Sequence, residues 1–147
     1  MKIMSRQLTI DLYNCSEKKL KDLDEIKNKI KEVIAGEIKL AAEKISEKHM
    51  AIIGAFDEGH IAVHIYNDLR YVAADVFTCS EDTEPEELSK ELRKYFKPDK
   101  TKSTYLKRGD FGQEREIKPK IKTKTAPLRK IQTTGAKVIK KLVHSNK

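Results

Sequence analysis

The chain has 147 residues and a net charge of +8, with 38% hydrophobic and 37% charged residues. This length predicts one domain with a modest core, and no apolar run approaches the roughly 20 residues of a membrane-spanning helix. The first residues lack the apolar segment of a secretory signal peptide, so we expect a cytoplasmic protein.

The N-terminal part of the chain predicts a strand followed by an amphipathic helix. Leu8, Ile10 and Leu12 alternate with polar residues, which is typical of a half-buried strand. From residue 17 to about 34, apolar residues recur every three or four positions, which predicts a helix ending near Gly36. The segment 37–45 is ambiguous, because its Ala, Glu, Lys and Leu content favours a helix whereas its pattern also suits a strand.

Three further strands and a second helix are predicted downstream. Residues 50–56 form an apolar run, 59–66 alternate, and 71–79 are rich in Val, Ala and Phe, so each is expected to be a strand. A proline and several acidic residues open a helix over 84–96, and 103–107 are expected to form a last strand. The order β-α-β-β-β-α-β predicts an α+β fold, a two-layer sandwich of a mainly antiparallel sheet with two helices on one face.

The positive charge is concentrated at the C-terminal end. Residues 110–147 hold 11 of the 31 basic residues but 3 of the 23 acidic ones, so they carry the whole net charge of +8. This division predicts a folded domain over 1–109 and a basic tail over 110–147. Residues 118–124 are expected to be an extended linker, too polar to pack as core.

The remainder of the tail has two interpretations. Residues 127–144 contain an apolar stripe that suits a short helix, but Gly135 and two threonines weaken it. The segment is then either a loosely docked or disordered tail, or a basic amphipathic element that binds an acidic partner, nucleic acid or its own domain. No aromatic residues stand between the lysines to stack on bases, so we expect only weak, nonspecific binding to polyanions.

The histidines and cysteines do not predict a metal site. His60 and His64 would lie on one side of a strand but about 13 Å apart along it, too far for one ion. Cys15 and Cys79 fit no metal-binding spacing and are expected to be free thiols.

Several motifs, in order, resemble those of one enzyme family. They are Ser5-Arg6-Gln7-Leu8, Glu58-Gly59-His60 with His64, the run Tyr71 to Cys79, and Lys107-Arg108-Gly109. Together they resemble the small bacterial and archaeal S-adenosylmethionine decarboxylases, which cleave themselves and use a pyruvoyl group. The resemblance covers Ser5 to Gly109 and implies a strand at 37–45.

The resemblance also implies that the central chemical step is lost. The family cuts a Glu-Ser-His motif before the serine, whose hydroxyl attacks the preceding carbonyl. Elimination then leaves a pyruvoyl group, which serves as the electron sink for decarboxylation. Gly59 occupies the serine's place and has neither the oxygen nor the β-carbon that this chemistry requires. We therefore expect no cleavage and no pyruvoyl cofactor.

Other positions match family residues with different degrees of retention. By this resemblance His64 is the processing base, Cys79 is the catalytic proton donor, and Glu58, Asp68 and Tyr13 bind the ligand. A gap-free count puts Ala51 in place of a serine that assists processing, and Ile45 in place of an adenine-stacking phenylalanine.

Each of these residues also has a structural interpretation. Cys79 can be a small buried hydrophobe, His64 a satisfied polar residue on a strand, and Glu58 a turn carboxylate. Asp75 lies within a predicted strand, where an unpaired acid is costly, so we expect it at an edge, at an interface or hydrogen-bonded.

The sequence therefore leaves three hypotheses for function. The first is a non-catalytic homologue in polyamine (spermidine) metabolism that forms a homodimer, or a heterodimer with an active decarboxylase, and senses a nucleoside or polyamine. The second is a decarboxylase precursor form, or an enzyme that works without pyruvate through Cys79 and His64. The third is a basic interaction module in which the tail matters and the domain is a scaffold.

Overall fold

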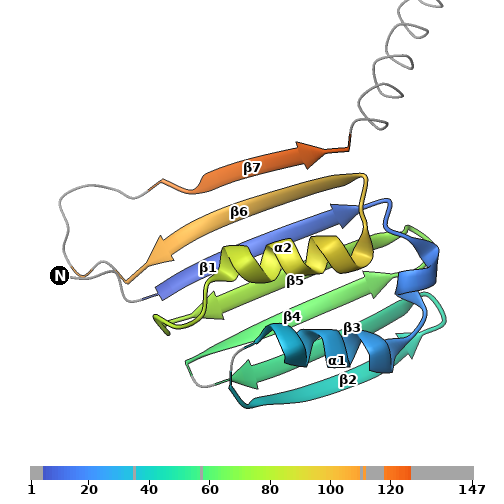
Figure 1. Cartoon of the computed structure of the whole chain (residues 1–147), viewed down its shortest axis with the longest axis horizontal. Coiled ribbons are helices and arrows are strands. Elements are labelled where there is room, and N and C mark those ends of the chain that lie inside the picture. The colour runs from blue at the N-terminus through green and yellow to red at the C-terminus, as the bar shows by residue number, and fades with distance from the viewer. Residues whose placement is uncertain (1–4, 35, 57, 110, 112–117, 127–147) are drawn as a thin grey trace, which may run out of the picture.

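In the computed structural model, seven antiparallel strands form one sheet and two α-helices cover one of its faces (Figure 1). The structure describes residues 5–34, 36–56, 58–109, 111 and 118–126. The strands are β1 (Ser5–Tyr13), β2 (Ile38–Ser46), β3 (His49–Phe56), β4 (Gly59–Tyr66), β5 (Tyr71–Thr78), β6 (Lys100–Arg108) and β7 (Lys120–Thr125). Their order across the sheet is β2-β3-β4-β5-β1-β6-β7. This arrangement confirms the predicted α+β sandwich.

The helical elements differ from the prediction mainly at the start of the first helix. The expected helix over 17–34 is divided into a 3-10 turn, η1 (Glu17–Leu20), and the helix α1 (Leu23–Val33). The division falls at Asp22, whose side chain accepts a hydrogen bond from the Glu25 amide at 3.1 Å and so caps α1. The second helix, α2 (Pro85–Phe96), has the predicted bounds and ends at Lys97 in a left-handed conformation. No helix in the described part of the chain is long and apolar enough to cross a membrane.

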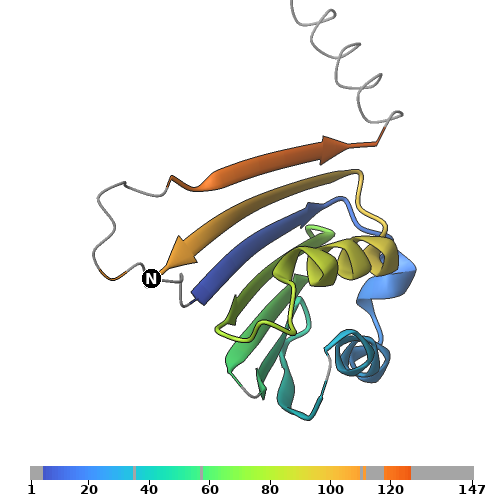
Figure 2. The same ribbon diagram turned by 60° about the vertical axis from the view of Figure 1, so that its left-hand side comes forward.

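The core lies between the helices and the sheet. Alternate residues of β1, β3, β4 and β5 point toward α1 and α2, as the period-two pattern predicts. Figure 2 shows both helices on this one side, so within the described part of the chain the opposite side of the sheet carries no helix. We call that side the open face. It presents the other half of each alternating pattern, including Ile53, His64 and Phe77.

The ambiguous segment 37–45 is a strand at one edge of the sheet. Ile38 of β2 pairs with Phe56, and the register continues along β3 to a bulge near Ser46. Ile38, Leu40 and Ala42 pack against the core, whereas the residues between them are exposed. Propensity favours a helix here, but the pairing partner on β3 and the apolar face beneath β2 select the strand.

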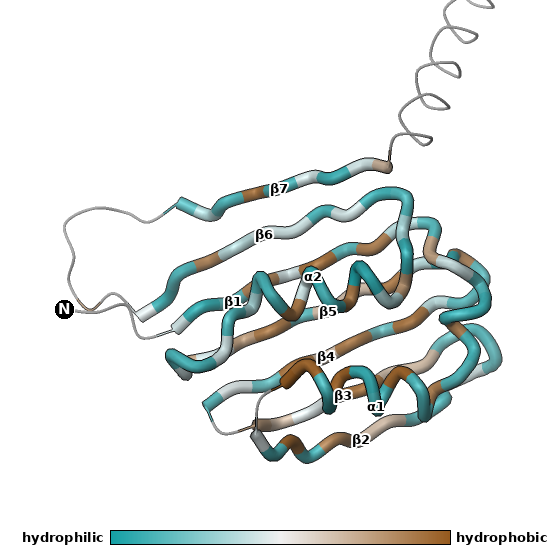
Figure 3. Tube along the Cα trace, viewed as in Figure 1, coloured by the Kyte–Doolittle hydropathy of each residue, from teal (hydrophilic) through white to brown (hydrophobic). Residues whose placement is uncertain are grey.

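The prediction of a linker over 118–124 is wrong, because most of that segment forms β7. Lys120 to Thr125 pair with Tyr105 to Lys100 of β6 and become the other edge of the sheet. Figure 3 shows that β7 is mostly hydrophilic, which is why its sequence does not suggest a strand. An edge strand can be stabilised by backbone hydrogen bonds, and lysines are common there because they discourage pairing with other chains. The possible helix at 127–144 lies outside the described residues.

Candidate functional site

The structure brings Glu58, Gly59 and Cys79 together at one end of the sheet. Glu58 precedes β4, Gly59 is the first residue of β4 and pairs with Thr78, and Cys79 follows β5. The Cys79 amide donates a hydrogen bond to the Glu58 carbonyl at 2.8 Å. This carbonyl belongs to the peptide bond that the motif would place at the cut. A donor on it would stabilise negative charge developing on the oxygen.

Gly59 occupies a position with no room for a side chain. A β-carbon built on Gly59 would lie 2.1 Å from the backbone oxygen of Phe77 and 3.0 Å from the Phe56 ring. The first of these atoms is part of the β4–β5 pairing, so it cannot move away as a flexible side chain would. The structure around Gly59 is therefore closed against the serine that the motif would carry, and these residues do not fit a pyruvoyl group formed at this position.

Arg6 holds the loop that follows Cys79. Its guanidinium donates to the carbonyls of Ser80 and Thr83, the latter at 2.9 Å, and lies 2.5 Å from a Glu84 carboxylate oxygen. One side chain thus fixes the residues between β5 and α2. The Ser5-Arg6-Gln7 motif drew attention to Arg6 only as part of a resemblance, and this structural role becomes visible only in the fold.

His64 belongs to a second group of residues on the open face. Nε2 of His49 lies 3.0 Å from Nδ1 of His64, so one ring donates a hydrogen bond to the other. The His49 ring also stacks on Tyr66, with centroids 4.5 Å apart and planes 8° from parallel. Ala51, which stands where the resemblance implies a helper serine, is the direct cross-strand partner of His64. The polar-residue interpretation of His64 therefore fits these contacts.

The two groups are far apart within one chain. His64 lies five residues along β4 from Gly59, which corresponds to roughly 16 Å. Asp68 lies in the turn after β4, beyond the end opposite Glu58, and pairs with Lys48 at 3.2 Å on the exposed surface. A single subunit therefore does not place Glu58 and Asp68 around one ribose, or His64 beside Cys79.

Tyr13 lies in a row of aromatic rings that crosses the open face. Its ring stacks on Tyr71 at 5.3 Å, and Tyr71 lies 5.9 Å from Tyr66. Burial, and secondarily the nearby Asp11 carboxylate, raise the pKa of Tyr13. Burial and a hydrogen bond to Asp11 also raise the pKa of Tyr71. These hydroxyls stay protonated at neutral pH and can donate hydrogen bonds.

The structure also tests the predictions for the two cysteines and excludes one of the three alternatives for Asp75. Cys79 is exposed, so its interpretation as a small buried hydrophobe is wrong, whereas Cys15 is buried; both thiols are free, as predicted. Asp75 is not at a sheet edge, because β5 lies between β4 and β1, and it sits half-buried on the open face opposite Ala62 and Thr9. Among the described residues, no cluster of three or more His, Cys, Asp or Glu side chains is arranged to hold a metal ion.

His49 and Tyr66 were not recognised as site residues from the sequence. The alternation over 59–66 places Tyr66 on the same face as His64, so part of the signal was present. His49 joins them only because β3 and β4 pair in a register that sets it opposite Tyr66. That register is a long-range property that the alternation of one strand does not reveal.

We expect the two thiols to differ strongly in reactivity. Cys79 is exposed, whereas Cys15 is buried. Burial raises the pKa of Cys15 to about 12, so the reactive thiolate of Cys15 is scarce at neutral pH. Brief treatment of the native protein with iodoacetamide should add one group, located on Cys79 by mass spectrometry. Cys79→Ser should stay unlabelled until urea unfolds it, and rapid labelling of Cys15 in the native protein would contradict this expectation.

Comparisons of this chain with a family model, with known sequences and with solved structures all find S-adenosylmethionine decarboxylases. Residues 6–109 match the family model described as S-adenosylmethionine decarboxylase. An S-adenosylmethionine decarboxylase proenzyme of Methanococcus maripaludis is 33% identical over 122 residues, covering 79% of this chain and 100% of that protein. The proenzyme of Thermoanaerobacter pseudethanolicus is 28% identical over 115 residues, covering 76% of this chain and 93% of that protein. The crystal structure of the adenosylmethionine decarboxylase from Aquifex aeolicus has a TM-score of 0.68 at 15% identity, covering 80% of this chain and 100% of that one.

Proposed function

Because this chain belongs to the S-adenosylmethionine decarboxylase family, we propose that it is a non-catalytic homologue that acts in polyamine (spermidine) metabolism in the cytoplasm. It retains the fold and part of the site but does not form the pyruvoyl group. The observation that carries this proposal is Gly59, which lacks the attacking oxygen and lies where a β-carbon would meet the Phe77 backbone at 2.1 Å.

Some residues of the site remain suited to binding rather than to chemistry. The Cys79 amide still bonds the Glu58 carbonyl, so the turn keeps its shape although the nucleophile is missing. Tyr13, Tyr71 and Tyr66 offer aromatic faces across the sheet, and such faces suit a flat nucleoside base. We propose that, across the interface of a dimer, these rings with Glu58 and Asp68 bind an S-adenosylmethionine-like nucleoside or a polyamine.

The separation of the two groups supports a dimer. Glu58, Gly59 and Cys79 lie at one end of the strands, whereas His49, His64 and Tyr66 lie on the open face nearer the other end. If two copies pack open face to open face about a two-fold axis, the first group of one copy can approach the second group of its partner. The partner is a second copy of this chain or an active decarboxylase, and the latter gives a regulatory role.

Two other hypotheses from the sequence concern an enzyme that works without pyruvate and a basic tail that binds polyanions. An enzyme that uses Cys79 with His64 needs the two side chains in contact. Within one chain they are on different strands and roughly 20 Å apart along the sheet, because His64 pairs with Ala73, six residues before Cys79. The basic tail remains a proposed weak polyanion binder, whose affinity should fall steeply with salt as counterions are released.

We expect the purified protein to remain one chain of 16.9 kDa without a reactive carbonyl. Gly59 cannot start the acyl shift, so neither cleavage nor a pyruvoyl group should appear. Intact-mass spectrometry before and after treatment with borohydride or a hydrazine probe checks both points, with an active pyruvoyl enzyme as positive control. Fragments of residues 1–58 and 59–147, the second with a blocked N-terminus, would overturn the proposed function.

A further inference from the structure

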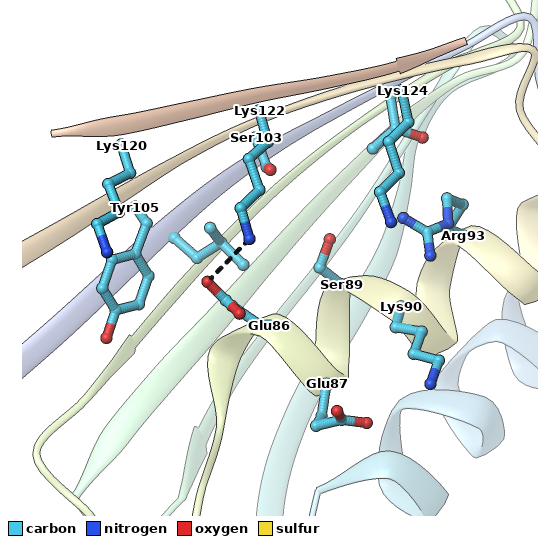
Figure 4. Close-up of a pocket in the computed structure, with 12 residues that line it drawn as sticks. Glu86, Glu87, Ser89, Lys90, Arg93, Ser103, Tyr105, Lys120, Lys122 and Lys124 are labelled. Carbon is cyan, nitrogen blue, oxygen red and sulfur yellow. Dashed lines mark ion pairs between the residues drawn. The ribbon is translucent and has the colours of Figure 1, made fainter.

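A cavity lies between α2 and the β6–β7 edge of the sheet, on the face that carries the helices (Figure 4). Its volume is about 180 Å³, several times the ~30 Å³ that one water occupies in the liquid. A group of several non-hydrogen atoms therefore fits. One wall is α2 and the other is β7, which lies beyond residues 6–109 that match the family.

The cavity is lined mainly by cations. Five basic side chains reach it, two from α2 and three from β7, against two acidic ones. They are Lys90, Arg93, Lys120, Lys122 and Lys124, with Glu86 and Glu87. The alternation of β7 explains why this strand supplies three of the five cations, because every second residue of the strand is a lysine that faces α2. This regular placement concentrates charge in one cavity.

Most of these cations are not neutralised within the described chain. The ion pair found inside the cavity joins Lys122 to Glu86 at 3.6 Å, between side chains that are both more than half exposed. Figure 4 shows Lys124 and Arg93 pointing toward one another with no acidic side chain between them. Two facing positive charges repel each other, and an anion between them would convert that repulsion into attraction.

Neutral hydrogen-bond donors complete the lining. Ser89 on α2 and Thr101 on β6 are 7% and 4% exposed, and Ser103 lies beside them on β6. Hydroxyl groups beside a guanidinium are a typical combination for a phosphate oxygen, because Arg offers two parallel N–H donors and the hydroxyls take the remaining oxygens. Glu86 and Glu87 add negative charge to the lining. A long anion that reached these carboxylates would be repelled by them, so the cavity favours a short anion.

We propose that this cavity binds a small multivalent phosphate, such as diphosphate or the phosphate group of a small molecule, with Arg93 and Lys124 as its main contacts. The site is separate from Glu58, Cys79 and His64, because those residues lie on other strands and His64 faces the open side of the sheet. It is thus independent of the proposed non-catalytic function, and either proposal can fail alone.

The test uses diphosphate and the full chain. Isothermal titration with diphosphate up to about 10 mM should detect binding to the wild type, and Arg93→Gln/Lys124→Gln should weaken it at least about tenfold. The matched control is Lys39→Gln/Lys44→Gln, which removes the same charge from β2 at the opposite edge and should leave affinity within about twofold. Without ligand, Arg93→Gln/Lys124→Gln should melt no lower than wild type, because it removes a repulsion. Lys124→Gln alone, which changes one residue of the exposed strand β7, is a milder variant and should weaken diphosphate binding less than the double substitution does.

Two results would overturn the proposal. One is the absence of diphosphate binding by the wild type; if such a protein instead binds duplex DNA at about 50 mM salt through Arg93 and Lys124, the cations serve a nucleic acid. The other is an equal loss of affinity in both double variants, which would mean that general charge rather than the cavity attracts the anion.

Discussion

Gly59→Ser is expected to stay uncleaved and to be less stable than the wild type. The added β-carbon meets the Phe77 carbonyl oxygen at 2.1 Å, so the β4–β5 pairing must open to admit it. Overpacking of this kind costs about 1–3 kcal/mol. Within its own chain the restored hydroxyl would also lack help, because Ala51 has no hydroxyl and His64 is roughly 16 Å along the same strand.

Two glycine variants separate the steric effect from the chemical one. Gly59→Ala introduces the same β-carbon without an oxygen, so it should lose as much stability as Gly59→Ser. Gly54→Ala is the comparison at another strand glycine, where the atoms nearest to the β-carbon belong to the flexible Leu40 and Ile38 side chains, which can adjust. Urea denaturation measures all three, and a denaturing gel follows cleavage. Efficient overnight cleavage of Gly59→Ser would show that the serine alone is missing, as in a precursor form.

The second large effect is expected at the open face. If two copies pack through it, Ile53, which is 55% exposed in the isolated chain, becomes buried. Ile53→Asp would then place an unpaired charge in an apolar interface, a change that costs several kcal/mol. The wild type should be a dimer at about 50 μM and Ile53→Asp a monomer, because even about 3 kcal/mol weakens association more than 100-fold.

Leu69→Asp provides the matched control for this experiment. Leu69 is 71% exposed but lies in the turn between β4 and β5 and not on a strand of the sheet, so the same change there should leave the dimer intact. Light scattering gives the mass of each variant, and circular dichroism verifies that the fold is kept. A monomeric wild type would contradict the dimer. Dissociation by both variants would contradict its placement on the open face.

The sequence determined the elements whose signal is local. The alternation over 8–13 and 59–66 predicted strands with one apolar face, the Val, Ala and Phe content of 71–79 predicted another strand, and the helical spacing over 17–34 predicted the inward side of α1. These predictions succeeded because hydrophobic periodicity depends only on near neighbours and on one buried side. The Glu58-Gly59-His60 motif likewise identified the turn before β4 as a candidate site, since residue type and spacing are enough to recognise it.

The tertiary structure decided everything that depends on pairing between distant segments. β2 and β7 are strands because β3 and β6 present free edges to them, although propensity and polarity favour other structures. Register set His49 beside His64, and the length of β4 kept Asp68 and His64 away from Glu58. The folded positions also made Cys79 accessible and closed the space around Gly59. Backbone hydrogen bonds between strands are indifferent to side-chain type, so the sequence of a single segment does not reveal which strand it will meet.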